Sequence, residues 1–587
     1  MSRSPSRSLL RQALHLTALK TFTPSSSVFS TQLPRTRMAS PSLGFLPLSA
    51  FIFPSTPSSL VLGLWLRTFS RMTFLLATKI SHEIKLLTIS SRYLPRHLHY
   101  VTIPVHKNAT LLSPDAVSGQ SRWPTVVFSH GLGGSRNAYS HLAGSLASHG
   151  IVVICPEHRD GSSIVSLARS TESTLFLKYP SRVFPCIRIP HTNTPEVWAA
   201  RDKQMRIRLW ELGLNLEAVL AIDNASFHVL KYNMNESTPE SAVSQFSGKL
   251  DVQEPGKIGF GGHSFGAATM VQLLKCTYYA GKPELSEMPT PLFTPSKDSA
   301  IRRQITEQTP TFLLDMWCFQ LLSAATEPLF NLPLPAYDDV PSAPGGNAIL
   351  AIESDGFYKW KAHLHSTARI LSPDPTQKVV SAERFTPTTL TTVNKPHFFY
   401  VRDSVHLNQS DFGLLFPWLT KKIFGGDNPE RVMRLNIRAL LQFFRENGVS
   451  GVAKTGAKEL VEGGVTLAEN EDGIHDDKAI LSNNGKGGSD VQAWVPINIV
   501  GLGAEAGPNE RELVSGQVTT SKAEEAEQAE EAMEGEIEPS LVKHQEAKVV
   551  SAEVVDDKEA KVASTAVTDG VKYKPASVET AVGAEAA

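Results

Sequence analysis

The chain has 587 residues, which is too long for a single compact domain of the usual size, roughly 100–200 residues. Its formal net charge of −1 joins two unlike ends: residues 1–82 carry nine Lys or Arg and no acid, whereas residues 521–587 carry 16 acidic and seven basic residues. A net charge near zero therefore gives no information about binding partners. No basic stripe interleaved with aromatic residues is present, so nothing in the composition indicates nucleic-acid binding.

Residues 1–95 predict a basic, Ser- and Arg-rich N-terminal extension. A composition almost without acids is typical of mitochondrial transit peptides, and a targeting segment and an unstructured extension fit this stretch equally well. The apolar region 43–66 is interrupted by Pro47, Pro54 and Pro57, whereas a membrane-spanning helix needs about 20 consecutive apolar residues. This region is therefore compatible with contact at a membrane surface, and it is a poor candidate for a spanning helix.

The sequence predicts a globular domain over residues 96–449. Short apolar runs alternate with helical patterns, and strands that are apolar on both faces are typical of a parallel sheet covered on both sides. The expected fold class is therefore α/β, with a mostly parallel sheet and helices on both faces. The expected strands are 99–106 at an edge, 125–131, 151–158, 257–262, 309–315, 348–355 and 397–403. The expected helices are 138–150, 204–222 and 428–444.

Residues 450–587 predict a disordered acidic tail. The segment is rich in Ala, Glu and Gly and has few aromatic residues. Such a chain cannot bury enough apolar surface to offset the entropy lost on ordering. We expect at most a transient helix over residues 522–537.

The four cysteines are Cys155, Cys186, Cys276 and Cys318. Their spacing fits no zinc site, and four in a chain of this length do not make a disulfide framework. Cys155 falls in a predicted buried strand, where a free cysteine behaves as a small apolar residue. We therefore expect reduced thiols in the core.

The segment KIGFGGHSFGAATM, residues 257–270, contains the pattern G-x-S-x-G around Ser264. A serine on a tight strand-to-helix turn takes strained backbone angles, and side chains at positions 262 and 266 would collide with the closely approaching chain. The helix that follows favours negative charge at the reacting centre. A purely structural turn is the alternative, but the apolar strand before the serine and the helical pattern after it favour a nucleophile.

A second glycine-rich turn, SHGLGG at residues 129–134, follows a predicted buried strand. In G-x-S-x-G hydrolases this loop supplies half of the oxyanion hole. We expect one backbone N–H donor from Phe265, directly after the nucleophile, and the other from Leu132. The alternative is a phosphate-binding turn, but neither GxGxxG nor GxxxxGK[ST] is present.

The acid and then the histidine of such a triad follow the serine along the chain. Two acids end predicted strands, Asp315 and Asp355, and both are expected at the carboxyl edge of the sheet, where ligands bind. The pattern does not decide between them. His406 lies just beyond the last predicted strand and is the expected base.

Five other histidines are not expected to act as the base. His397 opens the last predicted strand and so lies at the wrong edge of the sheet. His363 and His365 fall in the helix after Asp355 and are expected at the surface. His130 and His263 precede the serine along the chain and are expected to be structural.

Four motifs in this order resemble the platelet-activating factor acetylhydrolases of the plasma and intracellular type II group: FSHGLGGSRNAYSHLAGSLASHG followed by ICPEHRDGSS, then GHSFGAAT, LLDMWCF and SVHLNQSDF. Ala267 stands where that family usually has a glycine. The resemblance covers about residues 100–445 and implies neither terminal extension. It implies an α/β-hydrolase fold, assigns the acid to Asp315 with Asp355 as its rival, and places Trp317 in the acyl or substrate pocket.

The resemblance implies a serine esterase that removes a short sn-2 acyl group, such as acetyl, from platelet-activating-factor-like or oxidised glycerophospholipids. No metal or cofactor is expected, because Ser–His activation supplies the nucleophile. One alternative is a general carboxylesterase of the same fold, which would share every catalytic residue. Another is a catalytically silent hydrolase fold whose acidic tail binds a partner.

The expected compartment is the cytoplasm, with the mitochondrion as the alternative. Residues Asn408-Gln409-Ser410 form a glycosylation sequon two residues beyond the expected base. A glycan there would crowd the active site, which favours a compartment without N-glycosylation.

Overall fold

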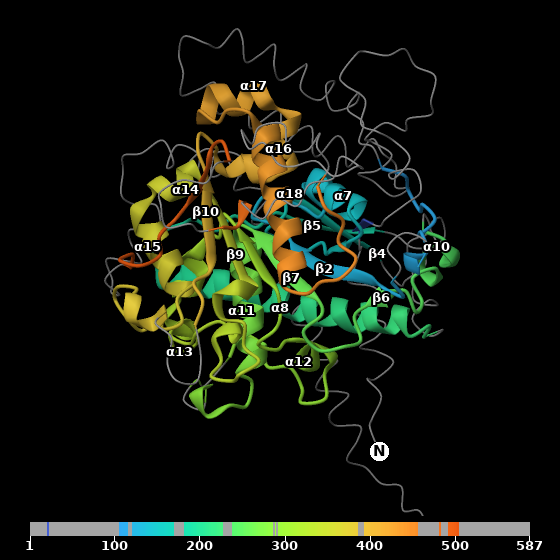
Figure 1. Ribbon diagram of the computed structural model, residues 1–587, viewed down its shortest axis with the longest axis horizontal. Helices are drawn as coiled ribbons and strands as arrows, with labels where there is room; N and C mark the ends of the chain where they lie inside the picture. Colours follow the sequence, from blue (N-terminus) through green and yellow to red (C-terminus); the bar gives the residue numbers. More distant parts are fainter. Residues whose placement is uncertain are drawn as a thin grey trace, which may run out of the picture. The chain divides into compact units, whose positions relative to one another are not determined.

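A nine-stranded, mostly parallel β-sheet forms the centre of the computed structural model (Figure 1). Its strands follow the order β1-β3-β2-β7-β8-β9-β10-β11, and β6 pairs with β2. Strands β3 to β10 of this path run parallel, while β1 and β11 run antiparallel at the two edges. The strands are β1 (Lys20–Phe22), β2 (Trp123–Ser129), β3 (Val152–Cys155), β6 (Leu250–Asp251), β7 (Gly259–His263), β8 (Thr311–Leu314), β9 (Ile349–Ser354), β10 (His397–Val401) and β11 (Trp494–Pro496).

The described part of the chain lies within residues 1–534, the first of two units. It comprises residues 20–22, 105–115, 120–169, 181–226, 238–285, 288, 291–385, 393–455, 480–482 and 491–503. Among these residues, no helix has both the length and the apolar character that are needed to cross a bilayer.

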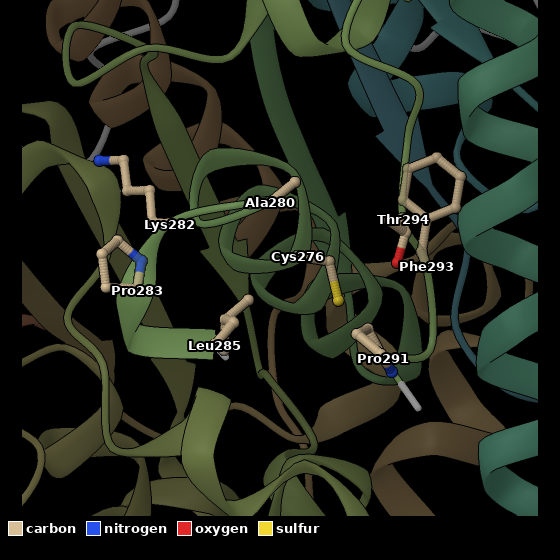
Figure 2. Close-up of a pocket in the computed structure, with 9 residues that line it drawn as sticks. Cys276, Ala280, Lys282, Pro283, Leu285, Pro291, Phe293 and Thr294 are labelled. Atoms are coloured by element: carbon tan, nitrogen blue, oxygen red, sulfur yellow. The ribbon is translucent and has the colours of Figure 1, made fainter. Parts of the chain in front are cut away.

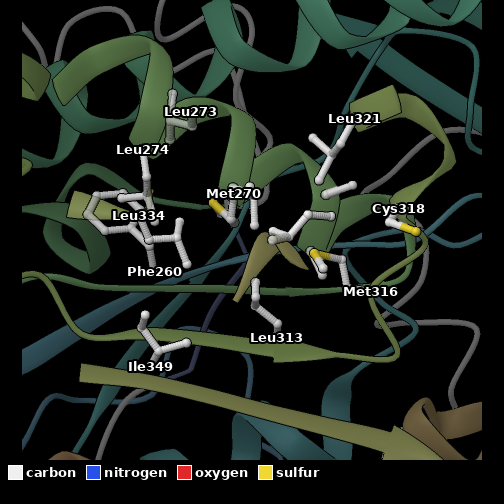
Figure 3. Packing of buried hydrophobic residues seen from close by; sticks show 14 of the residues in the cluster. Phe260, Met270, Leu273, Leu274, Leu313, Met316, Cys318, Leu321, Leu334 and Ile349 are labelled. Carbon is white, nitrogen blue, oxygen red and sulfur yellow. The ribbon is translucent and has the colours of Figure 1, made fainter. Parts of the chain in front are cut away.

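Helices cover both faces of the sheet, as the sequence predicted. The long helices are α7 (Ser140–Ser148), α8 (Pro195–Asp223), α11 (Phe265–Tyr278) and α18 (Pro429–Glu446). One buried apolar cluster joins α8 and α11 to one face, and a second cluster joins α7 and α18 to the other. Successive residues of β2 alternate between the two, because Val126 belongs to the second cluster and Val127 to the first. Figure 3 shows Met270 of α11 above Leu313 of β8.

The strands predicted between residues 125 and 403 are all present, with bounds that differ by a few residues. The predicted edge strand at 99–106 is not tested over residues 99–104, which lie outside the described part, and residues 105–106 are not in a strand. Helix α8 begins nine residues before its predicted start. The Thr194 side chain accepts a hydrogen bond from the Val197 N–H at 3.4 Å, and Pro195 occupies the first turn, which is a favoured helix start.

Other elements were not predicted. A two-stranded antiparallel hairpin, separate from the main sheet, pairs β4 (Val165–Arg169) with β5 (Ser181–Pro185). The short helices that were not predicted are α10 (Glu240–Ser244), α12 (Ala300–Gln304), α13 (Glu327–Phe330), α14 (Asp355–Lys359), α16 (Asp411–Leu415) and α17 (Pro417–Leu419). Helix α15 (Lys361–Ile370) is the helix expected after Asp355. The 3-10 turns used below are η2 (Cys318–Leu322) and η7 (His406–Gln409).

The strand order changes direction between β2 and β7. From β2 the chain crosses to β3 on one side, and after β3 it returns to β7 on the other side. In open parallel sheets, ligands bind outside the carboxyl ends of the strands at such a switch point. Ser129, the last residue of β2, is aligned with Gly262 of β7, so the loops that follow these two strands start side by side.

The prediction of disorder over residues 450–587 is wrong for residues 491–503. Strand β11 from this segment pairs antiparallel with β10, with Val401 opposite Trp494. Trp494 is 1% exposed, its ring stacks on Phe399 at 4.8 Å, and its Nε1–H donates to the Ile480 carbonyl oxygen at 2.7 Å. The composition of the whole tail hid a short apolar run, VQAWVPINIV, that can be buried.

The predicted N-terminal extension is described only at β1, where Lys20, Thr21 and Phe22 pair with Cys155, Ile154 and Val153 of β3. The other predictions for residues 1–95, and the transient helix expected at 522–537, concern residues outside the described part of the chain.

Replacing Trp494 by Ala should lower the free energy of unfolding by about 3–5 kcal/mol, the usual cost of emptying a buried aromatic site. Urea unfolding followed by circular dichroism measures the change. Val379→Ala is the control, because Val379 is an apolar side chain that is 51% exposed. If W494A costs no more than V379A, the tail strand is not part of the cooperative fold.

Candidate active site

Ser264 occupies a strained turn between β7 and α11. Its backbone angles are φ 55° and ψ −122°, a conformation that is costly for any residue with a side chain. A Cβ atom at Gly262 would lie 2.5 Å from the Gly266 carbonyl carbon, and one at Gly266 would run into the Ser129 carbonyl oxygen. The steric need for two glycines, predicted from the sequence, is thus present in the structure.

His406 and Asp315 form a hydrogen-bonded pair at the same edge of the sheet. The His406 Nδ1 lies 3.1 Å from the Asp315 Oδ2, and the Asp315 side chain is fully buried. Two hydrogen bonds tie Asp315 to β9: its N–H donates to the Ile352 carbonyl oxygen at 2.9 Å, and the Ser354 N–H donates to its side-chain Oδ1. The bond at Nδ1 leaves the Nε2 of His406 as the nitrogen that can exchange a proton with a substrate or a nucleophile.

The structure separates the two candidate acids. The carboxylate of Asp355 pairs with Lys359 at 2.5 Å, one turn along α14. The backbone N–H of Asp355 donates to the Ser404 hydroxyl oxygen at 3.2 Å. Among the described residues, Asp315 is therefore the carboxylate that contacts His406.

The other histidines lie largely as expected, with one correction. His397 begins β10, at the far end of that strand from His406. His363 is not a surface residue: it is fully buried, and its Nε2 accepts the Cys318 N–H at 3.1 Å. His365 is half-buried, with its Nδ1 2.6 Å from the Gly503 carbonyl oxygen. Helix α15 is covered by neighbouring segments, which its own sequence does not reveal.

The His406 ring lies between two other rings. It stacks on Phe357 with a centroid distance of 4.4 Å, and the His263 ring lies 4.4 Å away on a tilted plane. Burial, and next the neighbouring His406, hold the pKa of His263 well below its usual value. His263 therefore stays neutral, and its ring provides a fixed surface against which the His406 imidazole is oriented.

The expected oxyanion donors lie next to the nucleophile. Phe265 is the first residue of α11, and Gly131 in the other loop approaches so closely that an added Cβ would lie 3.1 Å from the Ser264 Cβ. Neither the Leu132 N–H nor the Phe265 N–H donates to a protein acceptor within the described part of the chain. By contrast the flanking Gly133 N–H donates to the Ser162 carbonyl oxygen at 2.8 Å. Two unpaired N–H groups beside a nucleophile are suited to an oxyanion.

Several known proteins are similar to parts of this chain. The family model described as platelet-activating factor acetylhydrolase, isoform II, matches residues 78–326. A putative phospholipase A2 of Schizosaccharomyces pombe is 27% identical over 366 residues, which cover 60% of this chain and 73% of that protein. The match with this family is confined to residues 78–326. This part contains Ser264 and Asp315, while His406 lies beyond it.

Members of this family from mammals align over a shorter part. The platelet-activating factor acetylhydrolases of Bos taurus and Cavia porcellus are 31% and 30% identical over 33% of this chain, and each alignment covers 43% of the relative's length. Among solved structures, a ferulic acid esterase from Streptomyces cinnamoneus aligns with 16% identity and a TM-score of 0.26, over 58% of this chain and 78% of that one. The sheet topology is that of an α/β-hydrolase fold, and the family match over residues 78–326 supports a carboxylic ester hydrolase.

Arg208 of α8, which was not predicted from the sequence, contacts both halves of the candidate oxyanion hole. Its side chain is fully buried; Nη1 donates to the His130 carbonyl oxygen at 2.8 Å, and Nε donates to the Asp160 carboxylate at 2.6 Å. The guanidinium also lies over the Phe265 ring, 4.2 Å from its centroid, and Nη2 donates to the Ser162 hydroxyl at 2.5 Å. The Arg208 guanidinium therefore contacts three parts of the site. These are the turn at His130, the loop at Ser162, whose carbonyl oxygen accepts from the Gly133 N–H, and Phe265 after the nucleophile.

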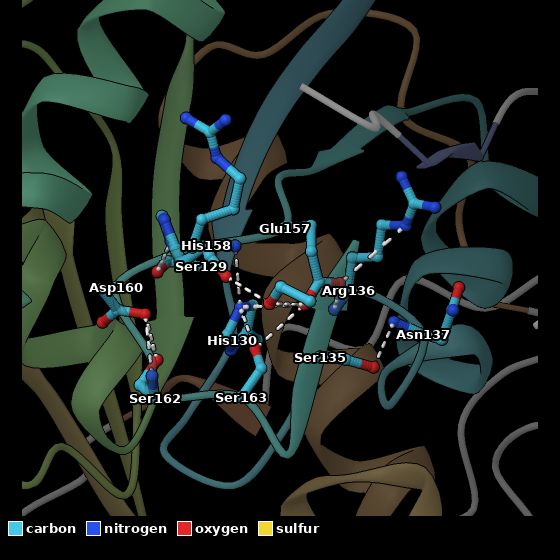
Figure 4. Close-up of polar contacts among 12 residues, drawn as sticks. Ser129, His130, Ser135, Arg136, Asn137, Glu157, His158, Asp160, Ser162 and Ser163 are labelled. Atoms are coloured by element: carbon cyan, nitrogen blue, oxygen red, sulfur yellow. Dashed lines mark hydrogen bonds and ion pairs between the residues drawn. The ribbon is translucent and has the colours of Figure 1, made fainter. Parts of the chain in front are cut away.

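A second set of contacts fixes the other side of the same loop (Figure 4). The Glu157 carboxylate accepts the Arg136 N–H at 3.0 Å and the Ser163 hydroxyl at 2.9 Å. His130 lies 4.0 Å from Glu157, and its Nδ1 lies 2.9 Å from the Gly131 carbonyl oxygen. Burial lowers the pKa of His130 to about 3, so this histidine is neutral and serves to shape the turn.

Ser129, His158 and Glu211 form a second serine–histidine–carboxylate chain that is not a candidate catalytic site. The Ser129 hydroxyl lies 2.9 Å from the His158 Nε2, and the His158 Nδ1 lies 2.9 Å from the Glu211 carboxylate. All three side chains are at most 1% exposed, so no ester carbonyl can reach the hydroxyl. Burial raises the pKa of Glu211 to about 8. These residues anchor the end of β2 to α8.

A sequence signal for these residues exists on α8. Arg201, Gln204, Arg208, Glu211 and Asn215 are all buried, and their spacing of three and four residues places them on one face of the helix. A polar stripe running beside the predicted apolar stripe indicates a face that is buried against polar partners.

Trp317 lies beside the nucleophile. Its N–H donates to the Ser264 carbonyl oxygen at 3.2 Å, and the residue is 4% exposed. Its ring packs against the rings of His191 at 4.6 Å, Phe319 at 5.7 Å and Phe265 at 6.4 Å. Aromatic groups thus fill much of the space on this side of Ser264.

The donor atoms of His263, Asp315 and His406 lie within 4.8 Å of one another, which is close enough to approach a metal ion. Their ring nitrogens and carboxylate are instead engaged in hydrogen bonds within the protein. The His406 Nδ1 is bonded to Asp315, and the His263 Nδ1 lies 2.8 Å from the Tyr139 hydroxyl. The donor set therefore fits a hydrogen-bonded acid–base pair, and no step of the chemistry below requires a metal.

A cavity of about 350 Å³ lies at the other end of α11 from Ser264, around Cys276, Lys282 and Phe293 (Figure 2). Burial raises the pKa of the Cys276 thiol to about 12, so this cysteine is not a nucleophile. All four cysteines are unpaired with one another, and Cys155, Cys276 and Cys318 are buried.

Replacing Arg208 by Lys keeps the charge but not the planar set of donors, so the loop before Leu132 should lose its fixed position. We expect kcat on a small ester to fall on the order of tenfold with KM within about twofold, because an oxyanion donor acts mainly in the transition state. Arg206→Lys, on the exposed face of the same helix, is the control. A folded R208K enzyme with the kcat of wild type contradicts this role.

Proposed function

We propose that the protein is a serine esterase that hydrolyses the short sn-2 acyl ester, such as acetyl, of platelet-activating-factor-like or oxidised glycerophospholipids and releases the lysophospholipid. The observation that carries the proposal is the hydrogen-bonded pair of His406 and Asp315, at 3.1 Å, on the sheet edge that also bears a strained serine. The names of the relatives, acetylhydrolase and phospholipase A2, support the choice of a phospholipid ester.

In the proposed mechanism Ser264 attacks the ester carbonyl carbon while the His406 Nε2 takes the hydroxyl proton. Asp315 accepts the Nδ1–H of His406, which fixes the imidazole and stabilises its charged form. The oxyanion that develops on the carbonyl oxygen accepts hydrogen bonds from the Leu132 and Phe265 N–H groups. His406 then gives its proton to the leaving lysophospholipid oxygen. A water molecule, activated by the same histidine, hydrolyses the acyl-enzyme and restores Ser264.

The preference for a short acyl chain is supported by the surroundings of the nucleophile. Ser264 is 3% exposed and His406 is 6% exposed. The Trp317 ring and its aromatic neighbours occupy the space beside the serine. An acetyl group needs little room there, whereas a long acyl chain would have to displace these rings from close-packed positions.

Peripheral contact with a membrane is also part of the proposal, and α17 is the element that we assign to it (Figure 1). Trp418 on α17 is 61% exposed, and the exposed Lys421 and Lys422 follow it. The Lys422 Nζ lies 5.3 Å from the Trp418 ring centroid. A tryptophan beside lysines suits the interface of an anionic bilayer, and α17 begins 11 residues after His406.

We also propose a cytoplasmic location. Asn408, the sequon residue next to the candidate base, is fully buried, and its side-chain oxygen accepts the Val405 N–H at 2.9 Å. A glycan on Asn408 is incompatible with this packing, which supports a compartment without N-glycosylation.

Replacing Ser264 by Ala should lower ester hydrolysis by at least about 10³-fold, because the nucleophile is lost. Wild type should cleave a 1-alkyl-2-acetyl phosphocholine at least about tenfold faster than the same lipid with a long sn-2 chain, measured by release of the lysophospholipid. Ser296→Ala, at an exposed serine, should behave as wild type. Equal rates on the two lipids remove the substrate assignment, a strong preference for a simple phenyl ester favours a general carboxylesterase, and full activity of S264A removes the site.

Replacing Trp418 by Ala should weaken binding to anionic phosphatidylserine-containing vesicles several-fold without changing hydrolysis of a soluble ester. Co-sedimentation with the vesicles measures the binding. Trp210→Ala is the matched control, since Trp210 on α8 is 38% exposed. Equal vesicle binding by W418A and wild type would show that α17 does not contact the membrane.

A further inference from the structure

A second buried carboxyl group, Glu353, lies directly behind the candidate triad. Glu353 is on β9 and is 1% exposed. The two hydrogen bonds that tie Asp315 to β9 involve the backbone of Ile352 and of Ser354, the residues on either side of Glu353. The register of the sheet therefore holds Glu353 and Asp315 next to each other across β8 and β9.

The carboxyl groups of Glu353 and Asp315 lie close enough to share a hydrogen bond. Two ionised carboxylates only accept hydrogen bonds, so a bond between them requires a proton on one of the two. Asp315 already accepts hydrogen bonds from His406 and from the Ser354 N–H, so its oxygens serve as acceptors. The proton therefore resides on Glu353, whose O–H donates to Asp315.

The surroundings of Glu353 agree with a neutral carboxyl group. Within the described residues no Lys or Arg pairs with it, and its Oε2 has no hydrogen-bond partner. The ionisable groups around it are Asp315 after β8, Tyr400 at the paired position of β10, and, beyond Asp315, His406 and His363. Burial, and next the charge of Asp315, raise the pKa of Glu353 well above its usual value.

We propose that Glu353 is a positioning residue that carries a proton at neutral pH and donates it in a hydrogen bond to Asp315, so that the triad is extended to four groups. The proposal rests on the proposed function for its catalytic consequence. A neutral donor behind Asp315 fixes the carboxylate in the orientation that faces His406. It also keeps the buried site at one negative charge, which the imidazolium formed during acyl transfer can neutralise.

The first test uses unfolding and does not depend on activity. In the folded protein the proton is held on Glu353, whereas in the unfolded chain it is lost above the usual pKa of 4.5. Unfolding near neutral pH therefore releases a proton, and the contribution of Glu353 to stability falls as pH rises. Between about pH 5 and 8 the unfolding equilibrium constant of wild type should rise by up to about tenfold per pH unit relative to that of Glu353→Gln. If the two proteins have parallel pH dependences, Glu353 is ionised in the folded state and the proposal is overturned.

The second test compares Glu353→Gln with Glu353→Ala, using p-nitrophenyl acetate hydrolysis as a function of pH. A glutamine amide can still donate to Asp315, so E353Q should keep kcat within about threefold of wild type and the same acid limb of the pH profile. Alanine cannot donate, so E353A should lose about tenfold or more in kcat with KM little changed. The matched control is Asp355→Asn, an acid two residues away that pairs with Lys359, and it should behave as wild type.

The outcomes separate the two proposals. Wild-type kcat in a folded E353A, or a loss in E353Q as large as that in E353A, overturns the positioning role of Glu353. A wild-type protein that hydrolyses no ester overturns the proposed function, while the unfolding measurement still decides where the proton resides.

Discussion

The close contact between the end of β2 and the turn after β7 is the constraint on which the site depends. Gly266 lies against the Ser129 carbonyl oxygen, and any side chain at Gly262 or Gly266 would separate the two segments. Because the strands are parallel and adjacent, this contact brings the loop that contains Leu132 to the nucleophile at Ser264. The serine takes its strained angles as part of the same fit, and the rest of the sheet supplies the acid and the base around it.

Charged groups buried around this contact are retained because each is paired or neutral. Arg208 is balanced by Asp160 at 2.6 Å and also binds the His130 carbonyl oxygen. Glu211 is close to Arg159 at 3.0 Å. Removing one member of such a pair leaves a buried charge uncompensated, which costs more than the pair itself contributes. The main effect of these buried charged groups is therefore to fix the position of the loop at the candidate oxyanion hole. Their contribution to the stability of the fold is smaller.

Local features of the site could be predicted from the sequence, because their causes are local. The turn at Ser264 follows from two glycines and the strand and helix beside them. The choice between Asp315 and Asp355 could not be made from the pattern, because it depends on the direction in which each carboxylate leaves its strand. Arg208 and Glu353 were missed for a related reason: a buried ionisable group is recognised by its partner, and Asp160 and Asp315 lie 48 and 38 residues away along the chain.

The tail was misjudged for a different reason, since averaging over residues 450–587 concealed a strand. Strand β11 occupies the outer side of β10, where the backbone N–H and C=O groups would otherwise be free to pair with another chain. A protein shortened before residue 491 would expose that row of groups together with Phe399, the ring on which Trp494 stacks. Strand β11 thus occupies a sheet edge that could otherwise pair with a second copy of the chain.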